Sequence, residues 1–138
     1  MRIRAVVLGL ALIALLAVAG CAGEVDAEPE TGALDLGSEV DPLTVSGRVA
    51  EGTVTVIDVR EDWEFAEGHI PGAVLIPLQT LPDRLDDIPR DHPVVMACRS
   101  GNRSGQAFRF LEAEGFDNVS NMTGGMIAWR EVGLDVEQ

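Results

Sequence analysis

The sequence contains one short run suited to nucleophilic chemistry, a cysteine followed at once by a turn with two arginines. Cys98 comes directly after the apolar run Pro93–Ala97, and the turn carries Arg99 and Arg103 before the helix-like stretch Ser104–Glu114. In a parallel α/β sheet, ligands bind beyond the carboxyl ends of the strands, and a helix start directs free N–H groups at the preceding loop. These groups and the arginine charges stabilise a thiolate, so we predict that Cys98 is a reactive, accessible thiol.

The two histidines of the chain do not supply an obvious base for this thiol. His69 stands in a Gly-His-Ile-Pro-Gly turn, where we expect it to hold the turn by hydrogen bonds, and His92 precedes a proline in a surface turn. A Cys–His dyad and a metal site both lack support, because one thiol and two scattered histidines show no ligand spacing. We therefore expect the loop itself to activate Cys98, with Gly101 letting the backbone turn inward.

Short strands and short helices alternate along the chain, and they must position this loop. The run Val54–Val59 is β-branched and apolar on both faces, as expected for a central parallel strand. Residues 40–50 are ambiguous, with Asp41 as a candidate helix cap. Further strands are expected at residues 73–76, 93–97 and 116–122, and helices at residues 62–67, 80–87, 104–114 and 126–131. The alternation predicts an α/β fold with a parallel sheet of about four to five strands and helices on both faces.

Length and charge narrow the class of protein. The chain has 138 residues, which is enough for one domain with one core. Its net charge is -13, and all ten of its basic residues are arginine. Such an acidic chain is not suited to binding nucleic acid, or to binding anionic lipid through a basic patch.

The N-terminal segment is typical of an export signal. Arginines lie within the first four residues, an apolar run extends over residues 5–19, and Val18-Ala19-Gly20 precedes Cys21. This arrangement resembles the lipobox of bacterial lipoproteins, in which the cysteine is acylated and becomes the first residue of the mature chain. We predict a lipoprotein signal peptide at residues 1–20 and a lipid anchor such as palmitate on Cys21. The alternative is an uncleaved membrane anchor, although the apolar run is short for a spanning helix.

This interpretation places the protein in the cell envelope, outside the cytoplasm and anchored by lipid to a bacterial membrane. Residues 21–39 are rich in acids and lack periodicity, so we predict a flexible tether there and a folded domain at residues 40–138. With Cys21 bonded to lipid, Cys98 is the only free thiol of the mature chain.

The loop and two flanking motifs resemble the rhodanese family. The loop run is Cys98-Arg99-Ser100-Gly101-Asn102-Arg103. The run Ile57-Asp58-Val59-Arg60-Glu61, followed by Glu67-Gly68-His69-Ile70-Pro71-Gly72-Ala73, is similar to the family's first signature. The run Met122-Thr123-Gly124-Gly125-Met126-Ile127-Ala128-Trp129 is similar to its second. The resemblance covers about residues 40–134 and implies a single-domain rhodanese-like fold.

The resemblance implies sulfur transfer by a thiosulfate-type sulfurtransferase that needs no cofactor or metal. Cys98 would take sulfur from a small anionic donor as a persulfide and pass it to cyanide or a thiol, while the loop residues 99–103 bind the donor. Arg99 and Arg103 would attract that anion. Asp58 could brace the loop and Arg60 could pair with a nearby acid, although we favour structural ion pairing for both residues, because such networks are common at strand ends.

Two other functions remain open. Phosphatases and arsenate reductases that share this fold need the spacing Cys-x5-Arg to fit a tetrahedral oxyanion, whereas Cys98 to Arg103 is Cys-x4-Arg. A non-catalytic anchored binding module is the third possibility, as in family members that have lost the cysteine.

Overall fold

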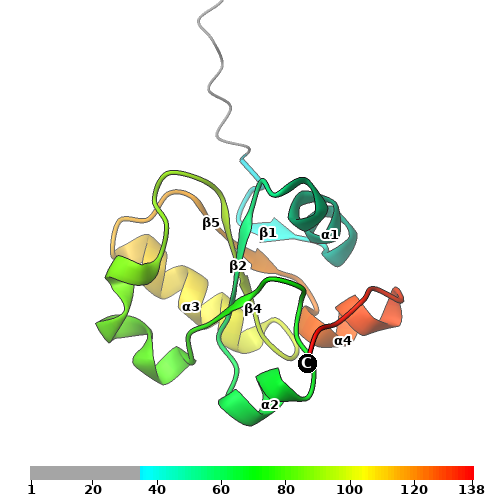
Figure 1. Ribbon diagram of the computed structural model, residues 1–138. Helices are drawn as coiled ribbons and strands as arrows, with labels where there is room; N and C mark the ends of the chain where they lie inside the picture. The colour runs from blue at the N-terminus through cyan, green and yellow to red at the C-terminus, as the bar shows by residue number, and fades with distance from the viewer. Residues whose placement is uncertain (1–34) are drawn as a thin grey trace, which may run out of the picture. The chain divides into compact units, whose positions relative to one another are not determined.

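The computed structural model describes residues 35–138, which form a five-stranded parallel sheet covered by helices on both faces (Figure 1). The strand order is β1-β5-β4-β2-β3. The strands are β1 (Glu39–Val40), β2 (Thr55–Asp58), β3 (Val74–Leu75), β4 (Val94–Ala97) and β5 (Val119–Met122). The helices are α1 (Pro42–Glu51), α2 (Asp62–Ala66), α3 (Asn102–Ala113) and α4 (Gly125–Glu131), with two 3-10 segments, η1 (Leu78–Asp83) and η2 (Leu85–Asp87).

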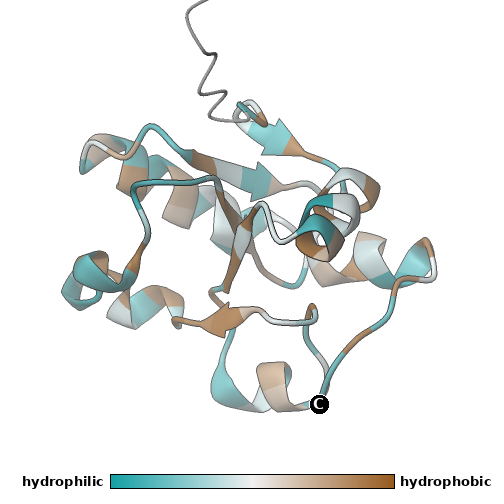
Figure 2. Cartoon of the chain, turned by 45° about the horizontal axis from the view of Figure 1, so that its top comes forward, coloured by the Kyte–Doolittle hydropathy of each residue, from teal (hydrophilic) through white to brown (hydrophobic). Residues whose placement is uncertain are grey.

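The sheet divides the core into two layers, because successive side chains of a strand point to opposite faces. In β4, Val94 and Met96 belong to the layer beneath α3, whereas Val95 and Ala97 belong to the layer beneath α1 and α4. Each helix in Figure 2 carries both brown and teal segments, as expected for helices that bury one side against a sheet. Cys98 continues the alternation and falls in the layer beneath α3.

Most of the elements expected from the sequence are confirmed, and the ambiguous residues after Val40 form helix α1. The side chain of Asp41 caps α1 by accepting from the backbone N–H groups of Leu43 and Thr44. The helix expected at residues 80–87 is wrong, because the chain forms η1 and η2 there instead. Pro82 lies inside η1 and has no N–H to donate to a longer helix.

Strand β1 extends the folded domain beyond the boundary expected from the sequence. Glu39, expected at the end of the tether, pairs with Asn121 of β5. Asn121 also donates its backbone N–H to the carbonyl of Ser38, and Ser120 donates its hydroxyl to the carbonyl of Gly37. The expected signal peptide, the lipidated Cys21 and most of the tether lie outside the described residues.

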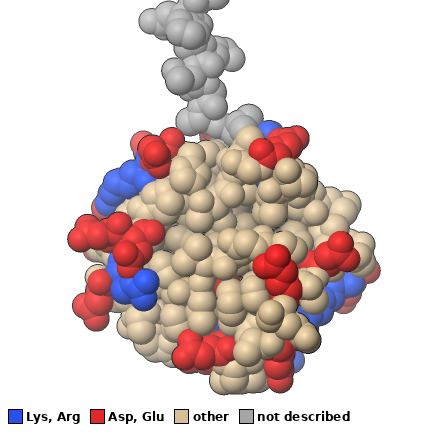
Figure 3. Space-filling model, in the orientation of Figure 1, with Lys and Arg blue, Asp and Glu red and all other residues tan. Residues whose placement is uncertain are grey.

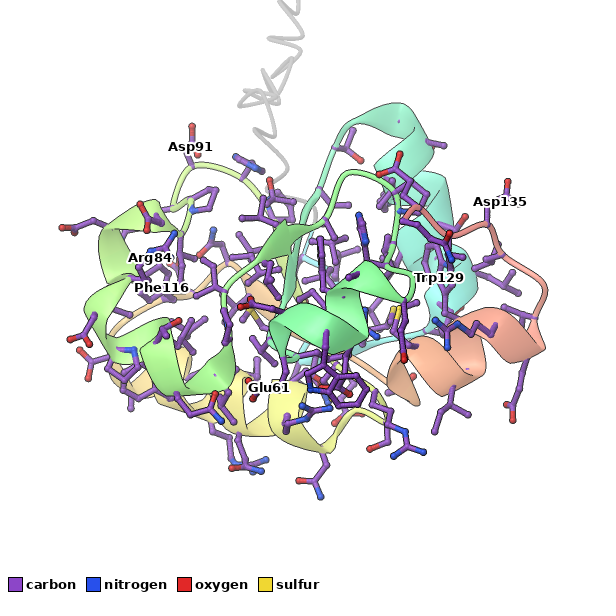
Figure 4. The ribbon with its side chains drawn as sticks, turned by 60° about the horizontal axis from the view of Figure 1, so that its bottom comes forward. Glu61, Arg84, Asp91, Phe116, Trp129 and Asp135 are labelled. Atoms are coloured by element: carbon purple, nitrogen blue, oxygen red, sulfur yellow. The ribbon has the colours of Figure 1, made fainter. Side chains whose placement is uncertain are left out.

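The C-terminal segment packs back onto the turn that contains His69, as antiparallel backbone hydrogen bonds join His69 and Glu137. The imidazole of His69 stacks on Phe65 and bonds to its carbonyl oxygen, so the expected turn-holding role is confirmed. The indole of Trp129 donates to the carbonyl of Asp135, and both residues are labelled in Figure 4. These contacts secure the end of the chain after α4.

Acidic side chains are distributed around the face of the molecule shown in Figure 3 and do not gather in one patch. Within residues 35–138, no helix is long and apolar enough to cross a membrane.

Candidate active site

The loop at residues 98–103 runs from the carboxyl end of β4 into the first turn of α3, at the centre of the sheet. Gly101 is the residue before α3 and has a φ of 91°, in the left-handed region that glycine adopts without strain. A Cβ at this position would lie 3.2 Å from the backbone nitrogen of Gly124. The backbones of the loop and of the turn before α4 therefore approach each other closely.

The thiol of Cys98 lies inside the loop and accepts hydrogen bonds from it. Its sulfur is 3.1 Å from the backbone nitrogen of Gly101 and 3.3 Å from the hydroxyl oxygen of Ser104. Burial by itself raises the pKa of this thiol, but the hydrogen bonds from Ser104 and from the N–H groups of Ser100 and Gly101 outweigh it and lower the pKa. The loop thus stabilises a thiolate without a neighbouring histidine.

One expectation about this thiol is wrong. The sequence predicts that Cys98 is accessible to solvent, but only 1% of the residue is exposed. The strand alternation directs it into the core layer beneath α3. The two histidines are bonded elsewhere, His69 to Phe65 and His92 to Thr55 and Asp91.

The first turn of α4 is hydrogen-bonded to the backbone of the loop. The backbone N–H groups of Met126 and Ile127 donate to the carbonyls of Cys98 and Arg99, at 2.8 and 3.0 Å. Gly125 lies against the loop backbone with a φ of 56°, and a Cβ there would overlap the carbonyl oxygen of Cys98. The second glycine of the Gly-Gly motif is therefore required by the close approach of two backbones.

Arg103 forms a bidentate ion pair with Glu64 of α2, with both N···O distances at 2.7 Å. Glu64 is 7% exposed. The Arg103 hydrogen bond is the main cause that lowers the pKa of Glu64 from 4.5 to about 2, and burial opposes it. The ion pair stabilises the folded state. Its contribution to the free energy of unfolding is complete above about pH 4.5 and is lost as the pH falls through about 2, where Glu64 becomes protonated. Arg103 therefore joins α3 to α2. Its hydrogen bond with Glu64 is the main cause that raises the pKa of Arg103, and a negative charge on Cys98 adds to this to a smaller extent.

Asp58 and Arg60 form a buried ion pair at the end of β2. The guanidinium donates to both carboxylate oxygens of Asp58, at 2.7 to 2.9 Å, and also to the carbonyl of Gly68. No hydrogen bond in the described part of the chain joins Asp58 to residues 98–103. The pairing expected for Arg60 is confirmed, whereas direct bracing of the loop by Asp58 is not seen.

The other loop side chains have separate environments. Asn102 accepts a hydrogen bond from Gln106 on the next turn of α3, and Ser100 is exposed. Arg99 is exposed and lines a cleft of about 410 Å³ beside the loop. The cleft is lined by Arg60, Trp63, Glu64, Glu67, Arg99, Met126, Ile127 and Arg130. Arg99 is thus the loop arginine that faces the cleft without an ion pair among the described residues.

A thiol stabilised by its own loop is the arrangement expected from the residues around Cys98. The family model of the rhodanese-like domain matches residues 41–132. The chain belongs to the rhodanese-like domain family.

Similar proteins and solved structures agree with this assignment. A sulfurtransferase of Allochromatium vinosum is 41% identical over 100 residues, which cover 72% of this chain and 94% of that protein. The thiosulfate sulfurtransferase GlpE of Stutzerimonas stutzeri is 35% identical over 75 residues, covering 54% of this chain and 69% of that protein. The crystal structure of a rhodanese-related protein from Thermoplasma volcanium aligns with a TM-score of 0.68 at 30% identity, covering 73% of this chain and 98% of the other. The sulfurtransferases among these relatives support sulfur transfer as the chemistry of this rhodanese-like domain.

Three contributors to the loop of this rhodanese-like domain were not predicted from the sequence. Ser104 was assigned only to the helix, although its position directly after the loop could have suggested a contact with the thiol. The Gly-Gly motif indicates that Gly125 has a special backbone role, but it does not show which segment packs against this glycine. Glu64 carried no signal, since it lies 39 residues before Arg103.

Ser104→Ala is expected to raise the pKa of Cys98, because it removes the hydroxyl that stabilises the thiolate. One such hydrogen bond contributes about 1 kcal/mol, which corresponds to a shift of roughly 0.5 to 1 pH unit. The pH profile of Cys98 alkylation by iodoacetamide should move to higher pH by that amount. Ser120→Ala is the matched control, because the Ser120 hydroxyl bonds to the carbonyl of Gly37. An unchanged profile in Ser104→Ala would contradict the assignment.

Proposed function

We propose that this rhodanese-like domain is a thiosulfate-type sulfurtransferase that carries sulfur as a persulfide on Cys98. The observation that carries the proposal is the environment of the thiol. Its sulfur accepts hydrogen bonds from the Gly101 N–H and the Ser104 hydroxyl, and together with the other loop N–H groups these lower the pKa of Cys98. The same donors can hold the terminal sulfur of a persulfide anion, which carries the same charge.

In the first step the Cys98 thiolate attacks the outer sulfur of thiosulfate. The S–S bond of the donor breaks, its electron pair leaves with sulfite, and a persulfide anion remains on Cys98. Arg99 faces the cleft, where its charge attracts the anionic donor. In the second step an acceptor nucleophile, cyanide or a thiolate, attacks the outer sulfur and releases the Cys98 thiolate. These steps require no cofactor.

Thiosulfate treatment is expected to add one sulfur atom to the protein, and cyanide should then remove it. Intact mass measured before treatment, after thiosulfate and after cyanide reports both half-reactions directly. Wild type that gains no sulfur at a tenfold molar excess of donor or above would refute the proposal.

A phosphatase function is less consistent with the geometry. The loop has the spacing Cys-x4-Arg, and Arg103 already forms two hydrogen bonds with Glu64. An arginine held in this way is not available to grip a phosphate with both of its terminal nitrogens. Hydrolysis of a phosphotyrosine analogue by wild type, lost in the Cys98→Ser protein, would instead favour a phosphatase. The intact loop also argues against a non-catalytic binding module.

We also propose that the protein acts as a lipoprotein of the cell envelope, anchored through Cys21. This proposal rests on the sequence of residues 1–21. Growth with a fatty-acid probe should label the wild-type chain, and Cys21→Ala should lose the label. Equal labelling of the two proteins would contradict the predicted lipid anchor. Cys98→Ala is the matched control and should keep the label.

A further inference from the structure

Asn121 of β5 carries a buried amide in the core layer beneath α3, which consists mainly of apolar side chains. The residue is 6% exposed. Strand β5 is the neighbour of β4 in the sheet (Figure 1), and Asn121 pairs with Met96. Met96 belongs to the layer beneath α3, as Cys98 does two residues later. Paired residues of neighbouring strands share a face of the sheet, so Asn121 lies on the same face as the thiol.

The amide nitrogen of Asn121 bonds to the loop residue that donates to the thiol. Its Nδ2 donates to the carbonyl oxygen of Gly101 at 3.3 Å, and the backbone nitrogen of Gly101 is 3.1 Å from the Cys98 sulfur. The same carbonyl accepts the first hydrogen bond of α3, from the N–H of Gly105 at 3.0 Å. A Cβ on Gly101 would lie 3.4 Å from the carbonyl oxygen of Met122, the next residue of β5. Strand β5 therefore packs against Gly101, and the amide of Asn121 bonds to it.

The amide oxygen of Asn121 does not contribute a hydrogen bond to the fold. This Oδ1 atom is buried and has no hydrogen-bond partner among residues 35–138. A buried polar atom without a partner destabilises the folded state, and native proteins contain few of them. Leucine has nearly the same shape as asparagine and would fill this place without an unpaired polar atom. Stability alone therefore favours an apolar residue here, and the amide indicates a role in the site.

We propose that Asn121 is a positioning residue for the nucleophile, because its amide nitrogen fixes Gly101 so that the Gly101 N–H stays directed at the Cys98 sulfur. Gly101 has a φ of 91°, and a glycine can leave such a conformation easily. Its N–H and its carbonyl belong to successive peptide groups, so a bond that fixes the carbonyl limits the directions of the N–H. Asn121 acts through Gly101 and not by a hydrogen bond to the sulfur. This inference rests on the proposed role of Cys98 as the nucleophile.

Asn121→Leu separates this role from a structural one. The variant removes both the donor to Gly101 and the unpaired oxygen, while the Gly101 carbonyl keeps its bond from Gly105. In the full chain, the melting temperature should stay unchanged or rise. The pH profile of Cys98 alkylation by iodoacetamide should move up by about 0.5 pH unit, because a less well directed N–H stabilises the thiolate less. Below the pKa, this shift corresponds to alkylation that is about threefold slower.

Two further variants distinguish the lost donor from a change in packing. Asn121→Ala removes the same donor but leaves a cavity, so its melting temperature should fall while its alkylation profile moves as in Asn121→Leu. Asn118→Leu is the matched control. Asn118 also has a buried, unpaired Oδ1, but its Nδ2 donates to the carbonyls of Pro89 and His92 at the opposite edge of the sheet. This control should lower the melting temperature and leave the alkylation profile unchanged.

An unchanged alkylation profile in Asn121→Leu would overturn the proposal, and so would an equal shift in Asn118→Leu. A shift in Asn121→Ala that is absent from Asn121→Leu would also overturn it, because the cavity and not the lost donor would then be the cause.

Alkylation needs no sulfur donor, so this test is independent of the proposed function. If thiosulfate adds no sulfur to wild type, sulfur transfer fails, and the pH profiles still report whether Asn121 positions the loop around Cys98. If sulfur is added but wild type and Asn121→Leu have the same alkylation profile, only the inference about Asn121 fails.

Discussion

Cys98→Ser is expected to abolish thiosulfate-dependent sulfur transfer while the domain remains folded. A serine hydroxyl does not ionise near neutral pH, so it cannot supply the anionic nucleophile that attacks the donor. Serine fits in place of cysteine and can accept the same hydrogen bonds from Gly101 and Ser104. The loss should therefore come from the missing thiolate and not from a displaced loop.

Two measurements check this result. Thiocyanate formation from thiosulfate and cyanide should fall to the uncatalysed background, and intact mass should show no added sulfur. Cys21→Ser is the matched control, since it makes the same substitution at the other cysteine of the chain and should keep full loading. A Cys98→Ser protein that still gained sulfur would place the reaction elsewhere.

Gly125→Ala is expected to impair the loop although it changes no group that reacts. The new Cβ would overlap the carbonyl oxygen of Cys98 and lie 2.7 Å from the carbonyl carbon of Arg99. Both neighbours are backbone atoms that cannot rotate away, so the loop or α4 must move. The hydrogen bonds from Met126 and Ile127 to the loop carbonyls would then lengthen or break. We expect sulfur transfer to fall by about a hundredfold, as misplacement of a catalytic group by about 1 Å does.

The backbone conformation adds a second cost in this variant. An alanine at a φ of 56° is strained by about 1 kcal/mol or more. For a domain of this size, each 1 kcal/mol lowers the melting temperature by about 4 to 8 °C. Gly133→Ala is the matched control, because Gly133 has a φ of 76° but nothing within 4 Å of its Cβ position. It should show the strain in its melting temperature and retain normal kcat/KM.

Equal loss of activity in Gly125→Ala and Gly133→Ala would contradict this account. It would mean that strain alone, and not contact with the loop, controls the reaction.

The order of the elements and the position of the nucleophile were predictable because they depend on local patterns. β-branched apolar runs favour strands, and the strand-turn-helix pattern around Cys98 places a thiol at the carboxyl edge of a parallel sheet. The cap at Asp41 and the turn at His69 also follow from neighbours in sequence. Strand β1 was not predictable, because two residues carry no periodicity and its pairing with β5 spans most of the domain.

By itself, the sequence determined that Cys98 directly follows an apolar strand of a parallel sheet and that its loop, not a histidine, must activate it. Only the tertiary structure decided how that loop works. It buried the thiol beneath α3, where Ser104 donates to it, and it paired Arg103 with Glu64. It also placed Arg99 and Arg130 around one cleft. The physical reason is that ion pairing and burial depend on contacts between segments that are far apart in the sequence. The residue types along the chain do not by themselves specify those contacts.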